Sequence, residues 1–509
     1  MTTTTTAGPA GVARVQASAY SSRQRKAALL VVALAFVMDL MDATILTIAL
    51  PTIQRAMHAS DTAMHWMAAA YALTFALLLI TSGRLGDVLG YKKMFIAGVA
   101  GFLVASLLVG VAPDPGALIA ARLVQGAAAA LVVPQVLSMI QLLYKAEERT
   151  RVNAMLGGLG MLATTLAPIG TGLLIKADIG GLSWRPAFLI NVPVCLAALP
   201  LAARYLPGGR SGRRLRVDVA GTVLVITAIG LLVFPLIQGR ELGWPAWAYA
   251  MAAASVPVLG VFAWQQRRKA ANGGSPLVVP ALFAHRSFSV GLAVSLLLFA
   301  TVPGFALTFS LLLQQGHGFS AIHTVLTALF LTAGMVLVAG SLSKKAIPAM
   351  GRWSLAIGTT VLAGGTAAVA VIASHAGPGL SSWQLAPALF VMGAGMGLVA
   401  VPLLPFILSG VHPDEAGAAS GVANAVQQIG GALGITVAGE VFFGQLTASA
   451  SYGHAFAATA IVQVALLAAA AALSLALPRR IAPGAEQGEL EYDITGPRWQ
   501  QRRAGHETP

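Results

Sequence analysis

The sequence has 509 residues, of which 57% are hydrophobic and only 10% are charged, and its mean hydropathy is +0.78. A soluble globular domain carries about 25% charged residues. The composition therefore excludes a soluble protein and indicates an integral membrane protein. The net charge of +14 does not indicate nucleic-acid binding. The basic residues cluster between apolar runs, as expected for loops near anionic lipid headgroups. Cys195 is the only cysteine, so the chain has no internal disulfide and no cysteine metal site.

Long apolar stretches recur along the whole chain. A helix that crosses a bilayer needs roughly 20 mostly apolar residues. The polar residues 1–26 and 478–509 are expected to be disordered. Residues 1–26 do not form a cleaved signal peptide, because the apolar run after Lys26 is too long and carries acids. Between these ends we predict an all-α polytopic membrane protein with helices over residues 27–50, 64–82, 94–112, 117–139, 152–175, 187–205, 218–237, 246–264, 287–312, 321–342, 353–373, 383–408, 417–443 and 455–477.

The basic residues test this count of fourteen, because cytoplasmic loops carry an excess of Lys and Arg. If the N-terminus is cytoplasmic and the helices alternate, nearly all of the 32 Lys and Arg residues fall on the cytoplasmic side. The external loops then hold only Arg55, Lys176, Arg185 and Arg240. A wrong helix count would scramble this asymmetry. We therefore predict an even number of helices in the cytoplasmic (inner) membrane, with both termini in the cytoplasm.

An internal repeat divides the chain. The run ARLVQGAAAALVVP at 121–134 recurs loosely as ALFVMGAGMGLVAVP at 388–402, and a polar turn and a Gly-rich helix follow each. The fourth and fifth helices thus correspond to the twelfth and thirteenth. A chance match between helices rich in Gly and Ala is the alternative. The repeat predicts an N-terminal six-helix bundle over 27–205, a linker with two inserted helices over 206–286, and a C-terminal six-helix bundle over 287–477.

Ionisable residues at membrane depth are costly, so each is a functional candidate by default. Asp39 and Asp42 are three residues apart in the first helix and therefore share a face. Two nearby carboxylates in a low dielectric resist ionising together. One of them can hold a proton at neutral pH and release it when water or a cation arrives. Alternatively, an Asp caps a broken helix or is neutralised by Arg122.

Arg122 is the only base predicted at membrane depth, and it keeps its charge at any ordinary pH. A buried guanidinium needs an acid or several carbonyls as partners. The first and fourth helices run in opposite directions, which puts Asp42 and Arg122 in the same outer half of the membrane. We expect them to pair, directly or through water, and to couple protons together with Asp39; a purely structural ion pair is the alternative. Glu440, near the external end of the thirteenth helix, is either a second cation-binding acid or a surface residue.

The segment GRLGDVLGYKK at 83–93 packs three glycines, one Asp and three basic residues into a predicted tight turn. It resembles the signature loop between helices 2 and 3 of major facilitator superfamily transporters. By this resemblance Asp87 would engage the cytoplasmic N-terminus of the thirteenth helix, an anion-favouring end, and hold the cytoplasmic side shut. The alternative is a loop that only sets topology. The residues that define this predicted gate loop are Gly83, Arg84, Asp87, Gly90, Lys92 and Lys93.

Several further runs resemble the 14-helix drug:proton antiporter branch of that superfamily, over about residues 28–475. MDATILTIALP at 41–51 resembles the branch's L-D-x-T-x-x-N-x-A-L-P, with Thr47 in place of Asn, and WRPAFLINVPV at 184–194 resembles its W-R-W-x-F-x-I-N-x-P. LIAARLVQGAAAA at 118–130 resembles the motif whose Arg is assigned a role in proton transfer. The antiporter motif of helix 5 matches only loosely, at Pro168, Gly170 and Gly172. Small residues let helices approach and Pro bends them, but ordinary packing is the alternative.

The resemblance implies the major facilitator fold, with two six-helix halves plus two inserted helices and a substrate held near the midplane between the halves. Aromatic and amide side chains at helical positions are candidates for that cavity, although such residues more often serve packing. The candidates are Trp66, Tyr71, Gln125, Phe305, Phe309, Asn424, Gln427 and Gln428, together with Glu440.

The predicted function is a secondary exporter that is not an enzyme. Protons would move inward while a hydrophobic, possibly cationic drug, antiseptic or secondary metabolite moves outward by alternating access. Transport of a polar metabolite or lipid, uptake by symport, and a non-transporting receptor or scaffold are the alternatives. The sequence has no HExxH motif and no P-loop. We therefore expect no cofactor or metal, the proton gradient as the driving force, membrane lipid as the surroundings, no nucleic-acid partner, and a functional monomer.

Overall fold

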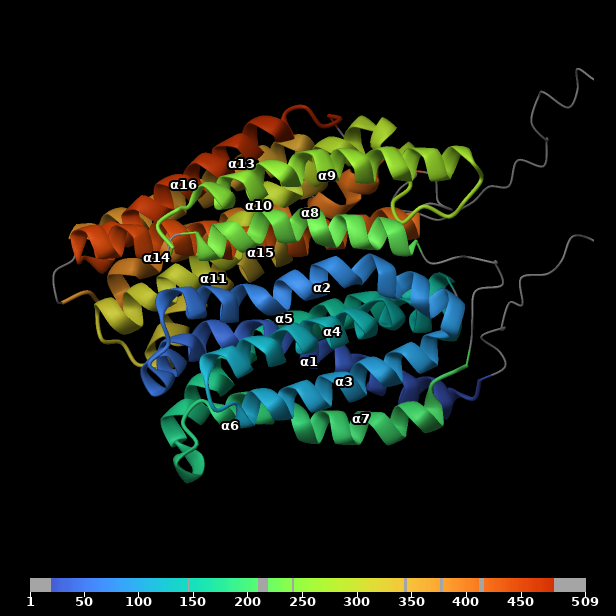
Figure 1. Cartoon of the computed structure of the whole chain (residues 1–509), viewed down its shortest axis with the longest axis horizontal. Coiled ribbons are helices and arrows are strands. Elements are labelled where there is room, and N and C mark those ends of the chain that lie inside the picture. Colours follow the sequence, from blue (N-terminus) through green and yellow to red (C-terminus); the bar gives the residue numbers. More distant parts are fainter. Residues whose placement is uncertain are drawn as a thin grey trace, which may run out of the picture.

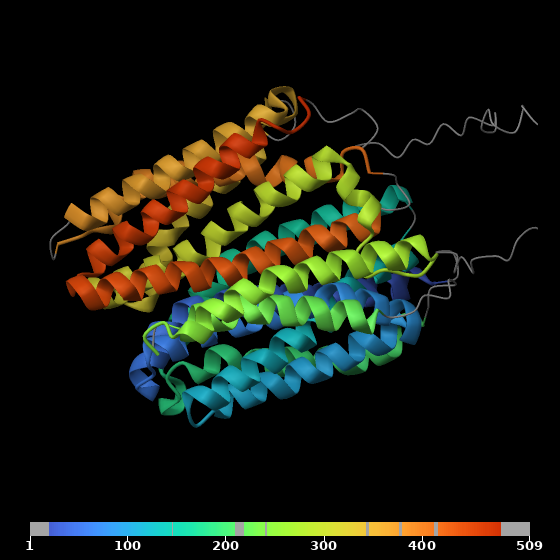
Figure 2. The same cartoon turned by 45° about the horizontal axis from the view of Figure 1, so that its top comes forward.

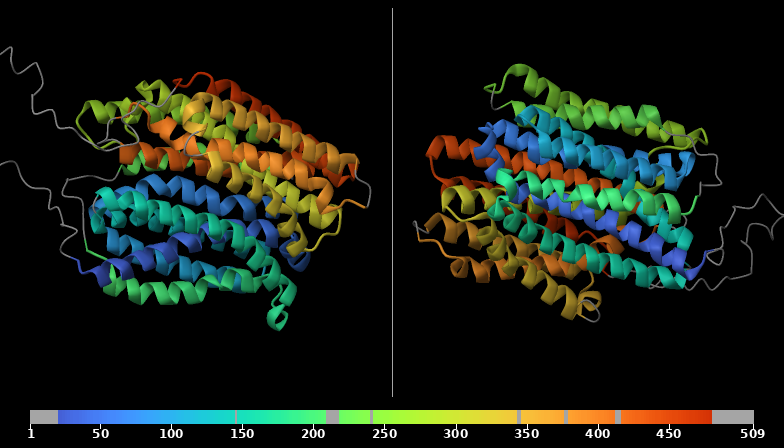
Figure 3. Two further views of the ribbon diagram at one scale, coloured as in Figure 1. Left: turned by 180° about the vertical axis from the view of Figure 1, so that it is seen from behind. Right: turned by 90° about the horizontal axis from the view of Figure 1, so that it is seen from below.

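The computed structural model describes residues 20–144, 146–208, 218–239, 242–342, 346–375, 379–411 and 416–479 (Figure 1). In these ranges the chain is almost entirely helical, and fourteen helices are long and apolar enough to cross a membrane. All of the long helices run along one common direction (Figure 3). The first long helix begins and the last one ends at the same end of the bundle, on the right of Figure 1, as an even number of spans requires. We call this the near end and the opposite one the far end.

The N-terminal half consists of six spans, and the sixth comprises the two helical segments α6 and α7. Only Ile190 separates them, and its φ of −59° and ψ of −25° are those of a right-handed helix. The bounds are α1 Ser22–Met57, α2 Asp61–Leu89, α3 Tyr91–Val111, α4 Pro115–Leu143, α5 Ala146–Ala177, α6 Arg185–Leu189 and α7 Asn191–Tyr205.

Two inserted helices and the C-terminal half follow. The short helices η2 Ile179–Gly181, η3 Pro280–Ala284 and α12 Ala346–Met350 lie in connections, and the π-helical turn η4 Leu312–Gly316 extends α10. The long helices are α8 Val219–Gln238 and α9 Ala246–Ala271, then α10 Arg286–Leu311, α11 Ala321–Leu342, α13 Arg352–His375, α14 Ser382–Leu408, α15 Ala416–Ser449 and α16 Tyr452–Ser474.

Helix boundaries differ from the prediction where local capping overrides hydropathy. Residues 22–26 were expected to be disordered, but α1 begins at Ser22 because Ser21 and Gln24 form a capping box. The tight turn predicted over 83–93 is also wrong. Helix α2 continues to Leu89, and the chain reverses at Gly90 alone, whose φ of 105° favours glycine. The expected disorder of 1–19 and of 480–509 lies outside the described residues.

The two halves pack their helices in the same way, which explains the internal repeat. An added Cβ on Gly126 of α4 would meet the backbone of Tyr71 in α2, and one on Gly393 of α14 would meet the backbone of Leu331 in α11. Gly126 and Gly393 occupy equivalent positions of the two runs. Small residues allow helices to approach closely in a membrane, where packing drives their association. The pattern shared by the two runs is therefore a packing pattern, with two six-helix halves arranged alike.

The inserted helices α8 and α9 lie outside the two halves. Helix α8 runs beside α2 and α15, and so covers a seam between the N-terminal and C-terminal halves (Figures 1 and 2). Apolar side chains of all three helices form one cluster there, which includes Ala69, Val233 and Ala432. The Thr81 and Thr222 hydroxyls, 2.9 Å apart, link α2 to α8. Helix α8 is thus held against both halves by apolar packing, with this polar contact to the N-terminal half.

The halves also meet across their far parts. Ser310 of α10 donates a hydrogen bond to the Thr47 carbonyl of α1 at 3.0 Å, and the amide of Gln314 lies 3.3 Å from the Ile48 carbonyl. Beside Ile48, where α5 and α11 share an apolar cluster, Gly172 of α5 packs directly on the backbone of Ile322 in α11. These contacts close the far half of the interface between the bundles.

Candidate functional site

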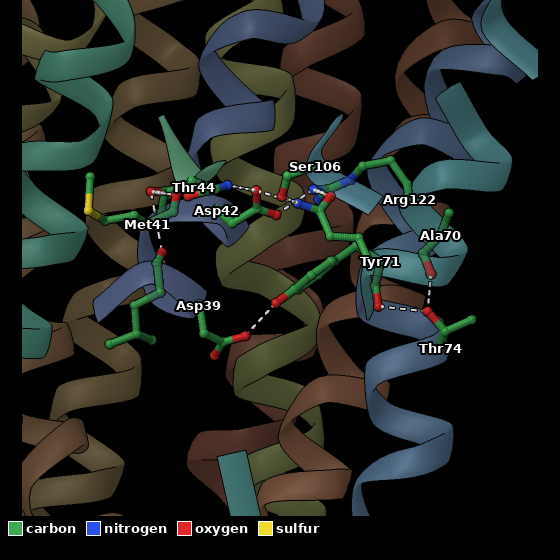
Figure 4. Close-up of polar contacts among 12 residues, drawn as sticks. Asp39, Met41, Asp42, Thr44, Ala70, Tyr71, Thr74, Ser106 and Arg122 are labelled. Carbon is green, nitrogen blue, oxygen red and sulfur yellow. Dashed lines mark hydrogen bonds and ion pairs between the residues drawn. The ribbon is translucent and has the colours of Figure 1, made fainter. Parts of the chain in front are cut away.

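A fully buried ion pair joins α1 to α4. One carboxylate oxygen of Asp42 lies 2.5 Å from a guanidinium nitrogen of Arg122 (Figure 4). The exposed fractions of the two residues are 0% and 1%. Such a pair is held in low dielectric, where its attraction offsets the loss of water only with good geometry and further hydrogen bonds.

Two side-chain amides supply those further bonds to Asp42. Gln125 and Asn191 each donate to the Oδ1 of Asp42 at 2.8 Å, while Arg122 donates to Oδ2. Gln125 also accepts a hydrogen bond from Arg122 at 2.8 Å and lies 3.1 Å from the hydroxyl of Ser106. The Asp42 carboxylate therefore has a cation and two amide donors, which favours its ionised form.

Aromatic rings enclose the guanidinium. The centre of the Arg122 guanidinium lies 4.6 Å from the ring centroid of Tyr71 and 5.8 Å from that of Phe188. Faces of aromatic rings attract cations, most strongly where water is excluded. The Nε atom of Arg122 is buried and has no hydrogen-bond partner among the described residues. One donor of the site is thus unused.

The second carboxylate, Asp39, lies about one helical turn from Asp42 toward the near end. The hydroxyl of Tyr71 donates to Asp39 at 2.5 Å (Figure 4), and Asp39 is 8% exposed. No ion pair of Asp39 occurs among the described residues. Tyr71 therefore touches both charged groups, with its ring on Arg122 and its hydroxyl on Asp39.

Local sequence spacing assembles this site. Asp39 and Asp42 on α1, and Arg122 and Gln125 on α4, are pairs three residues apart that share a helix face. Asn191, the first residue of α7, adds a third helix to the site by donating to Asp42. Sequence reasoning missed Asn191 and Ser106, although Asn191 stands in the run WRPAFLINVPV that marked the resemblance.

The predicted gate-loop residues lie at the near end of the bundle. Asp87 accepts a hydrogen bond from Tyr91 at 2.8 Å, Arg84 lies 3.4 Å from the Pro276 carbonyl, and Lys92 donates to the Ala203 carbonyl at 2.6 Å. The expected partner of Asp87, the start of α15, adjoins residues 412–415, outside the described residues. Gly83 packs on Pro134, Gly90 makes the turn, and Lys93 is exposed.

The candidates for a substrate cavity do not form one group. Tyr71 and Gln125 belong to the charge network, and Trp66 lies 3.4 Å from Gln238 of the inserted helix α8. Phe305 stacks on Phe309 inside the C-terminal half, where both are buried beside Phe456. On α15, the half-buried candidates are Asn424, Gln427, Gln428 and Glu440.

The loosely matched motif on α5 places its residues in different surroundings. Pro168 lies inside the helix, and Gly172 makes the close contact with Ile322 of the other half. A Cβ added to Gly170 would meet nothing within 4 Å. Of the two glycines, only Gly172 is required for close approach of the halves.

Comparison with known proteins identifies the class. Residues 32–435 match the model of the Major Facilitator Superfamily, and the chain therefore belongs to that family of membrane transporters. Among solved structures, an inward-facing, unoccupied bacterial homolog of the human lysosomal transporter Spinster has a TM-score of 0.61 at 18% identity, covering 90% of this chain and 98% of the other. An auto-inhibited peptide transporter of the POT family has a TM-score of 0.62 at 13% identity, covering 89% of this chain and 96% of the other. These likenesses concern the fold alone.

Sequence relatives narrow the class to drug efflux. The chain is 39% identical over 463 residues to a probable actinorhodin transporter of Streptomyces coelicolor, covering 89% of this chain and 78% of the relative. It is 34% identical to the cephamycin export protein of Amycolatopsis lactamdurans, with coverages of 87% and 91%, and 32% identical to a puromycin resistance protein of Streptomyces alboniger, with coverages of 85% and 84%. The chain is a multi-pass transporter of the drug-efflux branch and not an enzyme.

Proposed function

We propose that this protein is a proton-coupled exporter of hydrophobic antibiotics or secondary metabolites. The buried network of Asp39, Asp42 and Arg122 is the observation that carries the proposal. A transporter without ion coupling has no need of two carboxylates and a guanidinium at membrane depth, where ionisable groups are costly and mark proton and ion pathways. The proton gradient would drive the cycle, without a bound cofactor.

In an alternating-access transport cycle, this conformation would be the one that is closed on the external side. With both termini in the cytoplasm, the far end of the bundle is external, and the contacts of Ser310, Gln314 and Gly172 close the external side. The substrate would then enter from the cytoplasm between residues 27–205 and 287–477. Movement of these two bundles against each other would open the far side, with Asp87 closing the cytoplasmic one.

The substrate class follows from the relatives and from the apolar character of the C-terminal half. Relatives carry names of actinorhodin, cephamycin and puromycin transporters or resistance proteins. The C-terminal position equivalent to Arg122 is Leu389, which is fully buried. The buried charges of the network therefore belong to the N-terminal half, and the equivalent position of the C-terminal half is apolar, which suits a hydrophobic solute.

Transport into inverted membrane vesicles tests this function. Vesicles that contain the protein are given an acidic interior and then actinorhodin, puromycin, tetracenomycin C or a lipophilic cation. We expect uptake of at least one compound, which a protonophore abolishes and which vesicles without the protein do not show. Uptake that is unchanged by the protonophore would exclude proton coupling. Failure of every compound, with uptake of a polar metabolite or lipid instead, would overturn the assigned substrate class.

A further inference from the structure

The two carboxylates of the network differ in what compensates their charge. Asp42 has the guanidinium of Arg122 at 2.5 Å and amide donors from Gln125 and Asn191 at 2.8 Å. Asp39 has one neutral donor, the hydroxyl of Tyr71. The charge of Asp42 is therefore neutralised within the site, whereas an ionised Asp39 would be a second negative charge beside a single cation.

Protonation has opposite consequences at the two positions. A proton on Asp42 would leave Arg122, which is 1% exposed, as a buried cation without a counter-ion. Leaving one member of a buried pair unpartnered is strongly unfavourable. A proton on Asp39 instead removes an uncompensated charge from a site that is 8% exposed, and leaves the Asp42–Arg122 pair neutral.

From this difference we infer that Asp39 is the group that binds and releases the exchanged proton, while Asp42 stays ionised as the fixed counter-ion of Arg122. This inference rests on the proposed proton-coupled function and assigns proton binding and release to the Asp39 carboxyl group. On release, the O–H bond of the Asp39 carboxylic acid breaks, and the proton passes to water. The electron pair stays on the carboxylate, which keeps its hydrogen bond from Tyr71.

The position of Asp39 suits this exchange. Asp39 lies about one helical turn closer to the near end than Asp42 does. The contacts of Ser310 and Gln314 close the far half of the interface between the bundles. The titratable and charged groups around it are Tyr71 on α2, which contacts Asp39 directly, Asp42 on its own helix, and Arg122 on α4, which pairs with Asp42 and lies over the Tyr71 ring.

Infrared spectroscopy of the reconstituted protein tests the assignment without any substrate. At neutral pH, the C=O band of a buried protonated carboxylic acid is compared among wild type, Asp39→Asn and the double variant Asp42→Asn/Arg122→Gln, which keeps the net charge. We expect Asp39→Asn to lose a band that the double variant keeps. A band that survives Asp39→Asn would overturn the inference. If Asp39→Asn does not fold, loss of the band in the double variant overturns it and retention supports it.

Transport by the same variants separates this inference from the proposed function. In proteoliposomes, Asp39→Asn should keep substrate exchange but lose substrate accumulation driven by a pH gradient. Asp39→Glu, which keeps a carboxyl group, should retain that accumulation. If wild type accumulates substrate and Asp39→Asn does so equally well, Asp39 is not the carrier, although proton coupling stands. If wild type itself shows no driven accumulation, the proposed function fails, whatever the infrared result.

Discussion

The costs of losing Asp42 and of losing Arg122 should be clearly less than additive. At a charge separation of about 4 Å and an effective dielectric of about 20, the attraction is ~4 kcal/mol. Because both side chains are buried, Asp42→Asn or Arg122→Gln leaves an uncompensated charge, and each should lower the free energy of unfolding by about 3–5 kcal/mol. The double variant leaves no charge, so it should be clearly more stable than the sum of the single effects allows.

A double-mutant cycle in detergent measures this coupling, by chemical denaturation followed through tryptophan fluorescence. We expect a coupling of about 2–3 kcal/mol, within the range found for residues in contact. The partly exposed pair Arg25–Glu148 is a control, because its atoms are also 2.5 Å apart while its side chains are 21% and 42% exposed. Exposed pairs contribute about 0–1 kcal/mol. Additive single effects at Asp42 and Arg122 would refute the assignment of a charge-compensated buried pair.

Three further predictions concern helix packing and the near end of the inserted helix α8. Gly172→Val should block close approach of the halves and lower the transport rate, measured in vesicles, whereas Gly170→Val should not, since nothing lies near that position; equal loss in both would contradict this. Gly126→Ala should lower the free energy of unfolding in detergent by about 1–3 kcal/mol through overpacking. Gly364→Ala, whose added Cβ meets open space, should be neutral or stabilising. Burial disfavours ionised Asp218, but bonds from Lys269, Gln266 and Gly221 outweigh it and lower its pKa to about 2. The stability that ionised Asp218 contributes to the fold should therefore be constant from pH 8 to pH 5. It should fade below about pH 4, the ordinary pKa range of Asp, as the pH falls toward the folded pKa. A difference in melting temperature between wild type and Asp218→Asn that changes between pH 8 and pH 5 would exclude this.

The sequence predicts the helices and the ion pair well because membrane depth imposes simple rules. Apolar runs must form helices in lipid, where every backbone group has to be bonded within its own segment. The same rule makes isolated charges conspicuous, and a pairing of Asp42 with Arg122, direct or through water, could be anticipated from helix direction and depth; the structure shows the direct contact. The predicted all-α architecture with fourteen spans is confirmed.

Side-chain surroundings could not be predicted in the same way. Phe305 and Phe309 are aromatic residues of the kind that line binding cavities, yet they stack on each other within the C-terminal half. Trp66 contacts the inserted helix α8, whose position around the bundle has no signal in the sequence. Asn191 reaches Asp42 from the sixth span, 149 residues away in the chain. Helix rotation depends on packing partners far away in the chain, and hydropathy does not contain that information.

Counting protons against substrate tests the central claim most directly. Purified protein is reconstituted in liposomes that enclose a pH-sensitive dye, and the transported substrate is added with no imposed gradient. The account predicts that each substrate moved across the membrane is accompanied by an opposite movement of at least about one proton, seen as a substrate-dependent change of internal pH. Substrate movement with no change of internal pH would contradict proton antiport through this network.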